Sequence, residues 1–233
     1  VDGRFSVGSG ILSLFWLPPK SILGEAFLFE AAIITKGGSL MKNQTDVVMS
    51  KKLSADTRLL TRIGLLAALS VVFLLAVPRV ALVPAAPYLQ YDMADVPILL
   101  ASFLLGTGPG LCVLGLVSLI QGVVLGENGL VGALMHFCAT GGQVLVAVFI
   151  ANRLHSTKGL LLGLLAGSVT RMLIMIPMNL LITVYVFGQP AEIVRAAMLP
   201  GIMPFNFLVA AINSVIFFVI YTVNEKVFRD LTK

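Results

Sequence analysis

The stretch LVGALMHFCATGGQVLVAVFIA, from Leu130 to Ala151, decides the fold class because it contains no Lys, Arg, Asp or Glu. As a helix rising about 1.5 Å per residue, it is long enough to cross the hydrocarbon core of a bilayer, about 30 Å thick. The whole chain of 233 residues is 58% hydrophobic and only 12% charged, with a mean hydropathy of +1.00. Soluble domains carry about 25% charged residues. The composition therefore excludes a water-soluble globule and a disordered chain, and it predicts a polytopic membrane protein.

Five more apolar segments lie on either side of this stretch, separated from it and from one another by turn residues and charges. The Gly/Pro cluster Gly106–Gly110 favours two separate helices around it over one re-entrant hairpin. The sequence thus predicts an all-α membrane protein, a bundle of six transmembrane helices. The six predicted segments are Leu59–Val77, Asp95–Leu105, Leu111–Leu125, Leu130–Ala151, Leu160–Phe187 and Gly201–Tyr221.

Lysine and arginine positions predict the orientation, because cytoplasmic loops carry an excess of these residues. With the N-terminus inside, only Arg79 and Arg195 fall in outer loops, whereas ten basic residues lie on the inner side. We therefore expect both termini to be cytoplasmic. The spread of basic residues along the chain does not indicate nucleic-acid binding. The ten inner residues are Lys42, Lys51, Lys52, Arg58, Arg62, Arg153, Lys158, Lys226, Arg229 and Lys233.

The chain divides into an N-terminal tail, residues 1–57, a membrane domain, residues 58–228, and a cytoplasmic C-terminal tail, residues 229–233. Residues 1–40 show no sustained hydrophobic period and no convincing signal peptide. A polar, basic stretch follows Met41. We hypothesise that Met41 is the natural start and that residues 1–40 are upstream sequence, which mass spectrometry of the natively expressed protein would test.

Hydrogen-bonding side chains fall in the outer half of four predicted helices, where polar groups are costly unless paired or facing a cavity. For any single residue, hydrogen bonding between helices is an equally good explanation. Clustering of the whole set on one side favours a cavity, open to the outside, that binds a small polar or aromatic molecule. The set comprises Gln121, His136, Thr140, Asn179 and Asn206.

Three residues near this cluster have competing interpretations. Arg171 lies near the predicted midplane, and we expect contact with helix-terminal carbonyl groups in preference to an anionic ligand group. Asp95, followed by Pro97, is interpreted as a helix N-cap, which leaves no buried carboxylate in a span. Tyr91 serves equally well as an interfacial anchor or as a ring that stacks on a flat ligand.

Gly64 and Ala68 form a small-xxx-small face on the first predicted helix. Such a face allows close helix packing, either within this bundle or against a partner subunit. Enzymatic and metal-binding motifs are absent from the sequence: it has no P-loop, no H-E-x-x-H and no paired carboxylates in the predicted spans. His136 and His155 fall on opposite sides of the membrane. We therefore expect no metal, no cofactor and no catalytic activity in this chain.

Two motifs carry a family resemblance over about residues 58–228. The segment Tyr88–Pro97 contains D-x-x-D-x-P, with F-x-x-G-x-x-x-G after it at Phe103, and Gly201–Asn206 reads G-I-M-P-F-N. These segments resemble the second-helix and sixth-helix openings of the substrate-binding S components of energy-coupling factor transporters. The second motif is similar to that of the riboflavin-specific members.

The resemblance implies a multi-pass subunit of the bacterial plasma membrane that captures riboflavin or a related vitamin from outside. Delivery would require a transmembrane T subunit and two ATPase subunits, which would hydrolyse the ATP. The resemblance also implies that Asn179 and Asn206 bind the flavin ring. It further implies that Gly64 and Ala68 dock the partner T subunit. Val209 occupies a position where riboflavin members typically carry lysine.

Three alternatives stay open from the sequence. The first is an S component for a different vitamin or precursor, which the valine at position 209 keeps open. The second is an intramembrane enzyme acting on lipid-like substrates, disfavoured because no acidic or histidine pair lies in the predicted spans. The third is a purely structural or assembly subunit.

Overall fold

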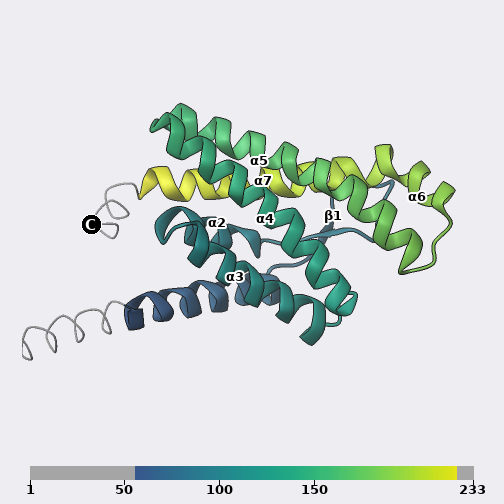
Figure 1. The fold of residues 1–233 in the computed structure, drawn as a ribbon, viewed down its shortest axis with the longest axis horizontal. Coiled ribbons are helices and arrows are strands. Elements are labelled where there is room, and N and C mark those ends of the chain that lie inside the picture. Colours follow the sequence, from purple (N-terminus) through teal and green to yellow (C-terminus); the bar gives the residue numbers. More distant parts are fainter. Residues whose placement is uncertain (1–55, 225–233) are drawn as a thin grey trace, which may run out of the picture. The chain divides into compact units, whose positions relative to one another are not determined.

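The computed structural model describes residues 56–224, and most of them are helical (Figure 1). The predicted tails, residues 1–57 and 229–233, and the proposed start at Met41 therefore lie outside the described residues, apart from positions 56 and 57. The elements are a helix at Asp56–Ala76, strands β1 (Val80–Ala81) and β2 (Gln90–Tyr91), helices α2 (Asp95–Leu104), α3 (Thr107–Leu119), α4 (Gly129–Leu154), α5 (Thr157–Met178), α6 (Ala191–Ala197) and α7 (Met203–Val223), and π-helical segments η1 (Ile120–Val124), η2 (Asn179–Thr183) and η3 (Met198–Ile202).

Five continuous helical runs are long and apolar enough to cross a membrane, and each overlaps one of the predicted segments over most of its length. The other predicted segment forms α2, whose ten residues make a shorter apolar helix. The prediction of a mainly helical, apolar bundle is thus confirmed. The five long runs are Asp56–Ala76, Thr107–Val124, Gly129–Leu154, Thr157–Thr183 and Ala191–Val223.

The turn between α2 and α3 is tighter than the sequence suggested. The helix α3 begins at Thr107, four residues before the predicted Leu111, because Pro109 falls in its first turn, where no intrahelical N–H is needed. Gly106 has a φ of 104°, a conformation that favours glycine. A Cβ on Gly110 would lie 2.6 Å from the Cα of Ser102, so α2 and α3 approach each other at backbone distance.

The short helix α2 lies at the centre of the bundle. Ile98 and Leu99 are fully buried in an apolar cluster that includes residues of α3, α4, α5 and α7. Phe217 of α7 closes this core, with its ring centroid 4.8 Å from that of Phe103. The largest helix–helix contact joins α4 and α5, which run side by side. This packing fixes the neighbours of every residue at the start of α2.

A two-stranded ribbon, β1–β2, interrupts the long connection before α2 and was not predicted. Val80 pairs with Tyr91, and Ala81 pairs with Gln90, in antiparallel register. The ribbon holds the connection against the bundle end from which α2 starts. It therefore fixes Tyr91 and the following Asp92 next to the N-terminus of α2.

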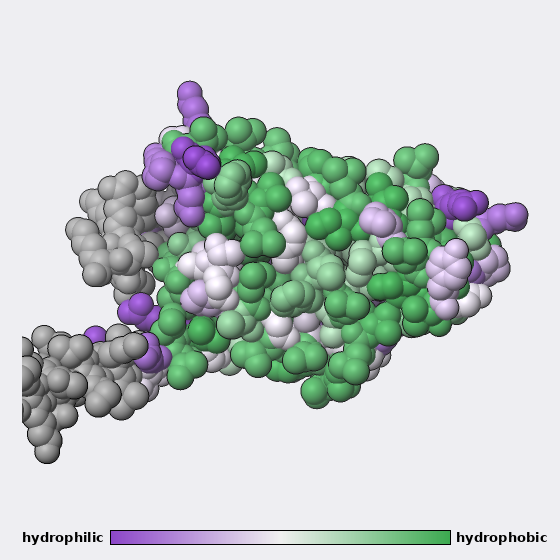
Figure 2. Space-filling model, viewed as in Figure 1, coloured by the Kyte–Doolittle hydropathy of each residue, from purple (hydrophilic) through white to green (hydrophobic). Residues whose placement is uncertain are grey.

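The lateral surface of the described bundle is apolar. Figure 2 shows green, hydrophobic residues over most of the flank, with hydrophilic residues concentrated towards the two ends. Large apolar side chains such as Leu65, Leu165 and Val215 are at least half exposed. An exposed apolar belt of this extent is typical of a surface that contacts lipid.

Gly64 and Ala68 are both exposed, and a Cβ on Gly64 would meet no atom within 4 Å. The small-residue face of the first helix therefore does not pack inside the described bundle. Of the two interpretations of this face, docking to a partner stays a prediction.

Candidate functional site

A cavity of about 760 Å³ lies at the end of the bundle where α3 and α5 end and where α4 and α7 begin. Its volume falls within the range of small-molecule sites, about 300–1,000 Å³. The wall combines apolar side chains with polar groups that converge from five helices and from the connection before α2. The polar lining residues include Asp92, Asp95, Ser118, Gln121, Glu127, His136, Arg171, Asn179, Thr183 and Asn206.

Four of the six predicted ligand-binding residues line this cavity: Gln121, His136, Asn179 and Asn206. They come from the four different helical runs that the sequence predicted. The remaining two, Thr140 and Tyr91, are buried behind the wall and do not line the cavity. Both hydrogen-bond to residues that touch the cavity or support it.

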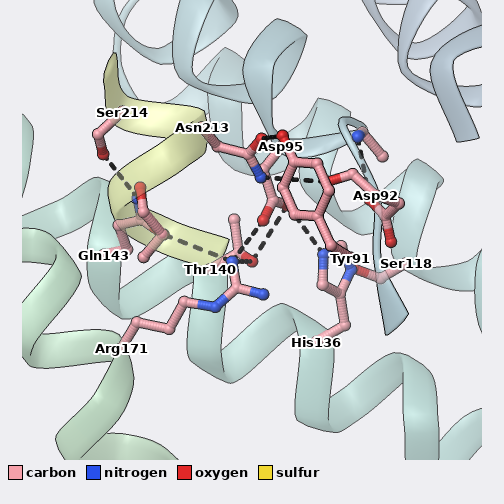
Figure 3. A network of polar contacts seen from close by, with 12 residues as sticks. Tyr91, Asp92, Asp95, Ser118, His136, Thr140, Gln143, Arg171, Asn213 and Ser214 are labelled. Atoms are coloured by element: carbon pink, nitrogen blue, oxygen red, sulfur yellow. Dashed lines mark hydrogen bonds and ion pairs between the residues drawn. The ribbon is translucent and has the colours of Figure 1, made fainter. Parts of the chain in front are cut away.

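The floor of the cavity is a buried ion pair between Asp95 of α2 and Arg171 of α5 (Figure 3). Asp95 Oδ1 lies 3.0 Å from His136 Nε2 and accepts a hydrogen bond from Thr140 Oγ1 at 3.3 Å. Arg171 Nη1 also donates to Thr140 Oγ1 at 2.9 Å. Because Asp95 and Arg171 are 2% and 7% exposed, their charges are neutralised by each other and not by water.

This arrangement corrects two expectations. Asp95 does not cap α2, because the N-cap residue is Ala94 and the Asp95 side chain points into the bundle. Arg171 does not meet helix-terminal carbonyls; instead it pairs with a carboxylate 76 positions earlier in the sequence. The expectation that no span would contain a buried acid is therefore wrong for α2.

The polar network extends from the floor to two further helices. Gln143 Oε1 lies 3.5 Å from Arg171 Nη1, and its Nε2 donates to Ser214 Oγ of α7 at 3.2 Å. On the other side, His136 Nδ1 lies 2.9 Å from Ser118 Oγ of α3. The floor thus ties α2, α3, α4, α5 and α7 together, and a change in any of these helices alters its geometry.

Tyr91 lies beneath the connection that precedes α2. Its hydroxyl donates to Asn213 Oδ1 at 2.8 Å, and Asn213 Nδ2 donates in turn to the backbone carbonyl of Asp92 at 3.3 Å. Burial, and secondarily the charges of Asp92 and Asp95, raises the pKa of Tyr91 to about 12. The phenol therefore stays protonated and keeps its role as a donor. Tyr88, which is exposed, lines the cavity in its place.

The mouth of the cavity is rich in hydrogen-bond acceptors. Gln121 Nε2 donates to Glu127 Oε2 at 2.7 Å and to Asp92 Oδ2 at 3.3 Å, and Arg79 forms an ion pair with Glu127. The carbonyl oxygen Gln121 Oε1 is buried, and among the described residues it has no hydrogen-bond partner. A ligand group that donates hydrogen bonds suits this position.

The two asparagines use their amide nitrogens locally. Asn179 Nδ2 donates to the Met175 carbonyl and Asn206 Nδ2 to the Ile202 carbonyl, both at 2.8 Å. Asn179 Oδ1 accepts from Thr183 at 3.3 Å. Within residues 56–224, the structure shows no donor to Asn206 Oδ1, so this oxygen is available to a ligand in the cavity.

Val209 lines the cavity within an apolar cluster that contains Val83, Tyr91 and Phe205. The side chain is 4% exposed, and the cavity wall here offers no ammonium group. The cations of this region are instead Arg171 at the floor and Arg79 beside the mouth.

Sequence reasoning missed Asp95, Arg171 and Gln143 as a connected floor. The signal that could have revealed it was present: an acid and a base of opposite charge, each placed at the depth of an apolar helix, where an unpaired charge is very costly. It could not be used because Asp95 also satisfies the pattern of a helix start.

The sequence and the fold of this chain are similar to those of known proteins. Residues 58–221 match the family model for the substrate-specific component of ECF transporters. The riboflavin transporter RibU of Staphylococcus aureus is 28% identical over 141 residues, which cover 58% of this chain and 74% of that protein. The riboflavin transporter FmnP of Bacillus subtilis is 29% identical over 143 residues, covering 58% and 75%. RibU of Streptococcus thermophilus is 29% identical over 176 residues, covering 71% and 82%.

A solved structure is also similar to this fold. The chain superposes with a TM-score of 0.63 and 27% identity on a structure described as "Structure and mechanism of the S component of a bacterial ECF transporter". The match covers 73% of this chain and 97% of that chain.

Proposed function

Because the chain belongs to the substrate-specific components of ECF transporters, we propose that its cavity captures riboflavin from outside the cell for uptake. Such a component is a multi-pass protein of the bacterial plasma membrane and binds the substrate that the transporter takes up. The observation that carries the choice of ligand is the convergence of Gln121, His136, Asn179 and Asn206 on one cavity.

The chemistry of the cavity suits a flavin. Asn206 Oδ1 can accept from a ring N–H, and Phe205 and Phe187 supply apolar wall beside it. At the mouth, Gln121 Oε1 and Asp92 accept hydrogen bonds, which suits the hydroxyl groups of a ribityl chain. Thr140 and Tyr91 support the site from behind, through Arg171 and Asn213.

The proposed topology has six transmembrane passes, with α2 as the short second pass, and both termini in the cytoplasm. It is supported by the polar cavity end facing away from the basic inner loop that contains Arg153 and Lys158. The membrane domain of this proposal spans residues 58–228, between an N-terminal tail, 1–57, and a C-terminal tail, 229–233. Labelling of single cysteines placed at each loop with a membrane-impermeant reagent tests it.

Partner subunits complete the proposal. A transmembrane T subunit would dock on the exposed face around Gly64 and Ala68, and two ATPase subunits would supply the energy. We infer that this chain is not an enzyme, because its relatives are transport proteins. An S component for another vitamin is the second candidate, favoured by the apolar Val209 in the wall.

Isothermal titration of purified, ligand-stripped protein with riboflavin tests the function. We expect binding tighter than micromolar, weakened by about 1–3 kcal/mol in Asn206→Ala, the range for one buried hydrogen bond. Asn224→Ala is the matched control, because its Nδ2 makes the same bond to a carbonyl four residues earlier but lies far from the cavity. Binding weaker than micromolar would exclude riboflavin, and mass spectrometry of the co-purified ligand would then identify another vitamin.

A further inference from the structure

The floor of the cavity contains donor groups that the protein itself leaves unused. A guanidinium has five N–H donors in a fixed plane. In Arg171, a single nitrogen, Nη1, makes the contacts with the described residues: with Asp95, with Thr140 at 2.9 Å and with Gln143 at 3.5 Å. Nε is buried and has no partner among the described residues, and no hydrogen bond from Nη2 is found there.

One whole edge of the guanidinium, formed by Nε and Nη2, is therefore unpaired. An unpaired buried donor costs free energy unless something else accepts from it. Arg171 lines the cavity. Because Nε is fully buried and Nη2 is not among the fully buried unpaired atoms, Nη2 is the donor on this edge that a ligand in the cavity reaches. Figure 3 shows the guanidinium extending from α5 towards Asp95 and Thr140, with one terminal nitrogen left free.

The charge balance selects the kind of group that fits. Asp95 neutralises Arg171, and Asp92 and Glu127 add negative charge to the same cavity wall. An anionic group at the floor would compete with Asp95 and would meet the field of these carboxylates. A neutral carbonyl oxygen accepts a charge-assisted hydrogen bond without that repulsion.

Position along α5 separates this donor from the asparagine nearer the mouth. Arg171 precedes Asn179 by eight residues, or about 12 Å along a helix. The residue therefore serves the deepest part of a bound molecule, next to Gln143 and the α7 backbone that Gln143 contacts at Ala210. Among the described residues that line the cavity, Arg171 is the only one that carries a positive charge with unused donors.

We propose that Arg171 is a specificity-determining residue, which donates a hydrogen bond from its unpaired edge to a neutral carbonyl oxygen of the bound molecule. This inference rests on the proposed function, under which the acceptor is one of the two pyrimidine carbonyl oxygens of riboflavin. Asp95 acts as its positioning residue: it holds the guanidinium in place and cancels its charge. Molecules of similar shape that lack a carbonyl at that end bind more weakly.

Analogues with one altered oxygen test the proposal. Riboflavin, 2-thioriboflavin and 4-thioriboflavin are titrated into the unaltered protein and into the double variant Asp95→Asn/Arg171→Gln. The double variant keeps the floor uncharged and avoids the buried unpaired carboxylate that a single Arg171 variant would leave. Gel filtration checks that each protein is monodisperse.

We expect one thio analogue to bind the unaltered protein about 10- to 100-fold more weakly than riboflavin, the range for a hydrogen bond to a charged donor. In the double variant this ratio should shrink several-fold or more, because the charged donor is gone. A purely structural role would weaken all three ligands by one common factor. An unchanged ratio in the double variant overturns the proposal.

Infrared difference spectra of the unaltered protein with carbonyl-¹³C-labelled riboflavin give a measurement that needs no variant. A stretching band shifted below its position in water is expected for one carbonyl. If neither carbonyl shifts downwards, the proposal fails even if the double variant does not fold. Tight riboflavin binding with no thio discrimination refutes the role of Arg171 alone, whereas absence of riboflavin binding refutes the proposed function as well.

Discussion

A single methyl group at Gly167 should disturb both the stability of the bundle and the floor of the cavity. Gly167 lies where α5 crosses α4, and a Cβ there would be 2.6 Å from the carbonyl oxygen of Gln143. Ordinary contact begins at about 3.4 Å. The helix α5 must therefore move away by about 0.8 Å, because backbone cannot rotate aside as a side chain can.

The expected cost of Gly167→Ala follows from two opposing effects. Overpacking of this kind costs about 1–3 kcal/mol, and the better helix propensity of alanine returns about 1 kcal/mol. Arg171 lies one turn further along α5, and a shift of about 0.8 Å would stretch its 2.9 Å bond to Thr140 beyond hydrogen-bonding distance. Ligand affinity should consequently fall as well, by about tenfold.

The matched control is Gly64→Ala, at an exposed glycine inside the first helix where a Cβ would meet no atom within 4 Å. It gains the same propensity without the clash, so the two variants should differ by about 2 kcal/mol. In a thermal series read by gel filtration, that difference corresponds to about 4–8 °C. If Gly167→Ala matches Gly64→Ala in both melting and riboflavin titration, the close α4–α5 approach does not control the site.

Three further outcomes are expected. Gly64→Leu or Ala68→Leu should abolish riboflavin uptake by whole cells. The affinity of the purified protein for riboflavin should stay unchanged, because both residues are exposed. Loss of riboflavin binding would instead indicate that these residues are needed for folding of the bundle. Tyr91→Phe removes a 2.8 Å hydrogen bond and should cost about 1 kcal/mol in thermal unfolding, with an unchanged midpoint arguing against the bond. Burial, more than the neighbouring carboxylate, raises the pKa of Asp92 above its ordinary value of 3.8. The folded state then binds this proton more tightly than the unfolded state, so stability falls as pH rises above about 4. Asp92→Asn has no carboxyl group to ionise, so its stability relative to the parent protein should increase with pH between 4 and 7. A stability difference that stays constant or decreases over this range would contradict the raised pKa of Asp92.

The helical segments and the position of the polar cluster could be predicted because both depend on local composition. Apolar runs of the length of Leu130–Ala151 have few alternatives, and the residues near their outer ends are fixed in depth by the 1.5 Å rise. Gln121, His136, Asn179 and Asn206 met in one cavity for this reason.

The floor of the cavity could not be predicted in the same way. Asp95 and Arg171 are 76 positions apart, and their pairing depends on how α2 is oriented at the centre of the bundle. The ribbon that places Tyr91 depends on only four paired residues, too few to produce a visible alternation of polar and apolar side chains. Tyr91 therefore faces Asn213 and not the cavity, although its sequence position beside Tyr88 gave no reason to separate the two.

The π-helical segments η1, η2 and η3 all occur in helical runs that border the cavity. Each such turn accommodates about one residue more than an α-helical turn, so the side chains beyond it are rotated by about 100°. Removing one residue from η2 would restore regular α-helical winding. It would also rotate the side chains that follow η2 about the helix axis. When sequences of this family are compared, a single-residue gap at one of these segments would therefore indicate a member whose cavity is lined by differently oriented side chains.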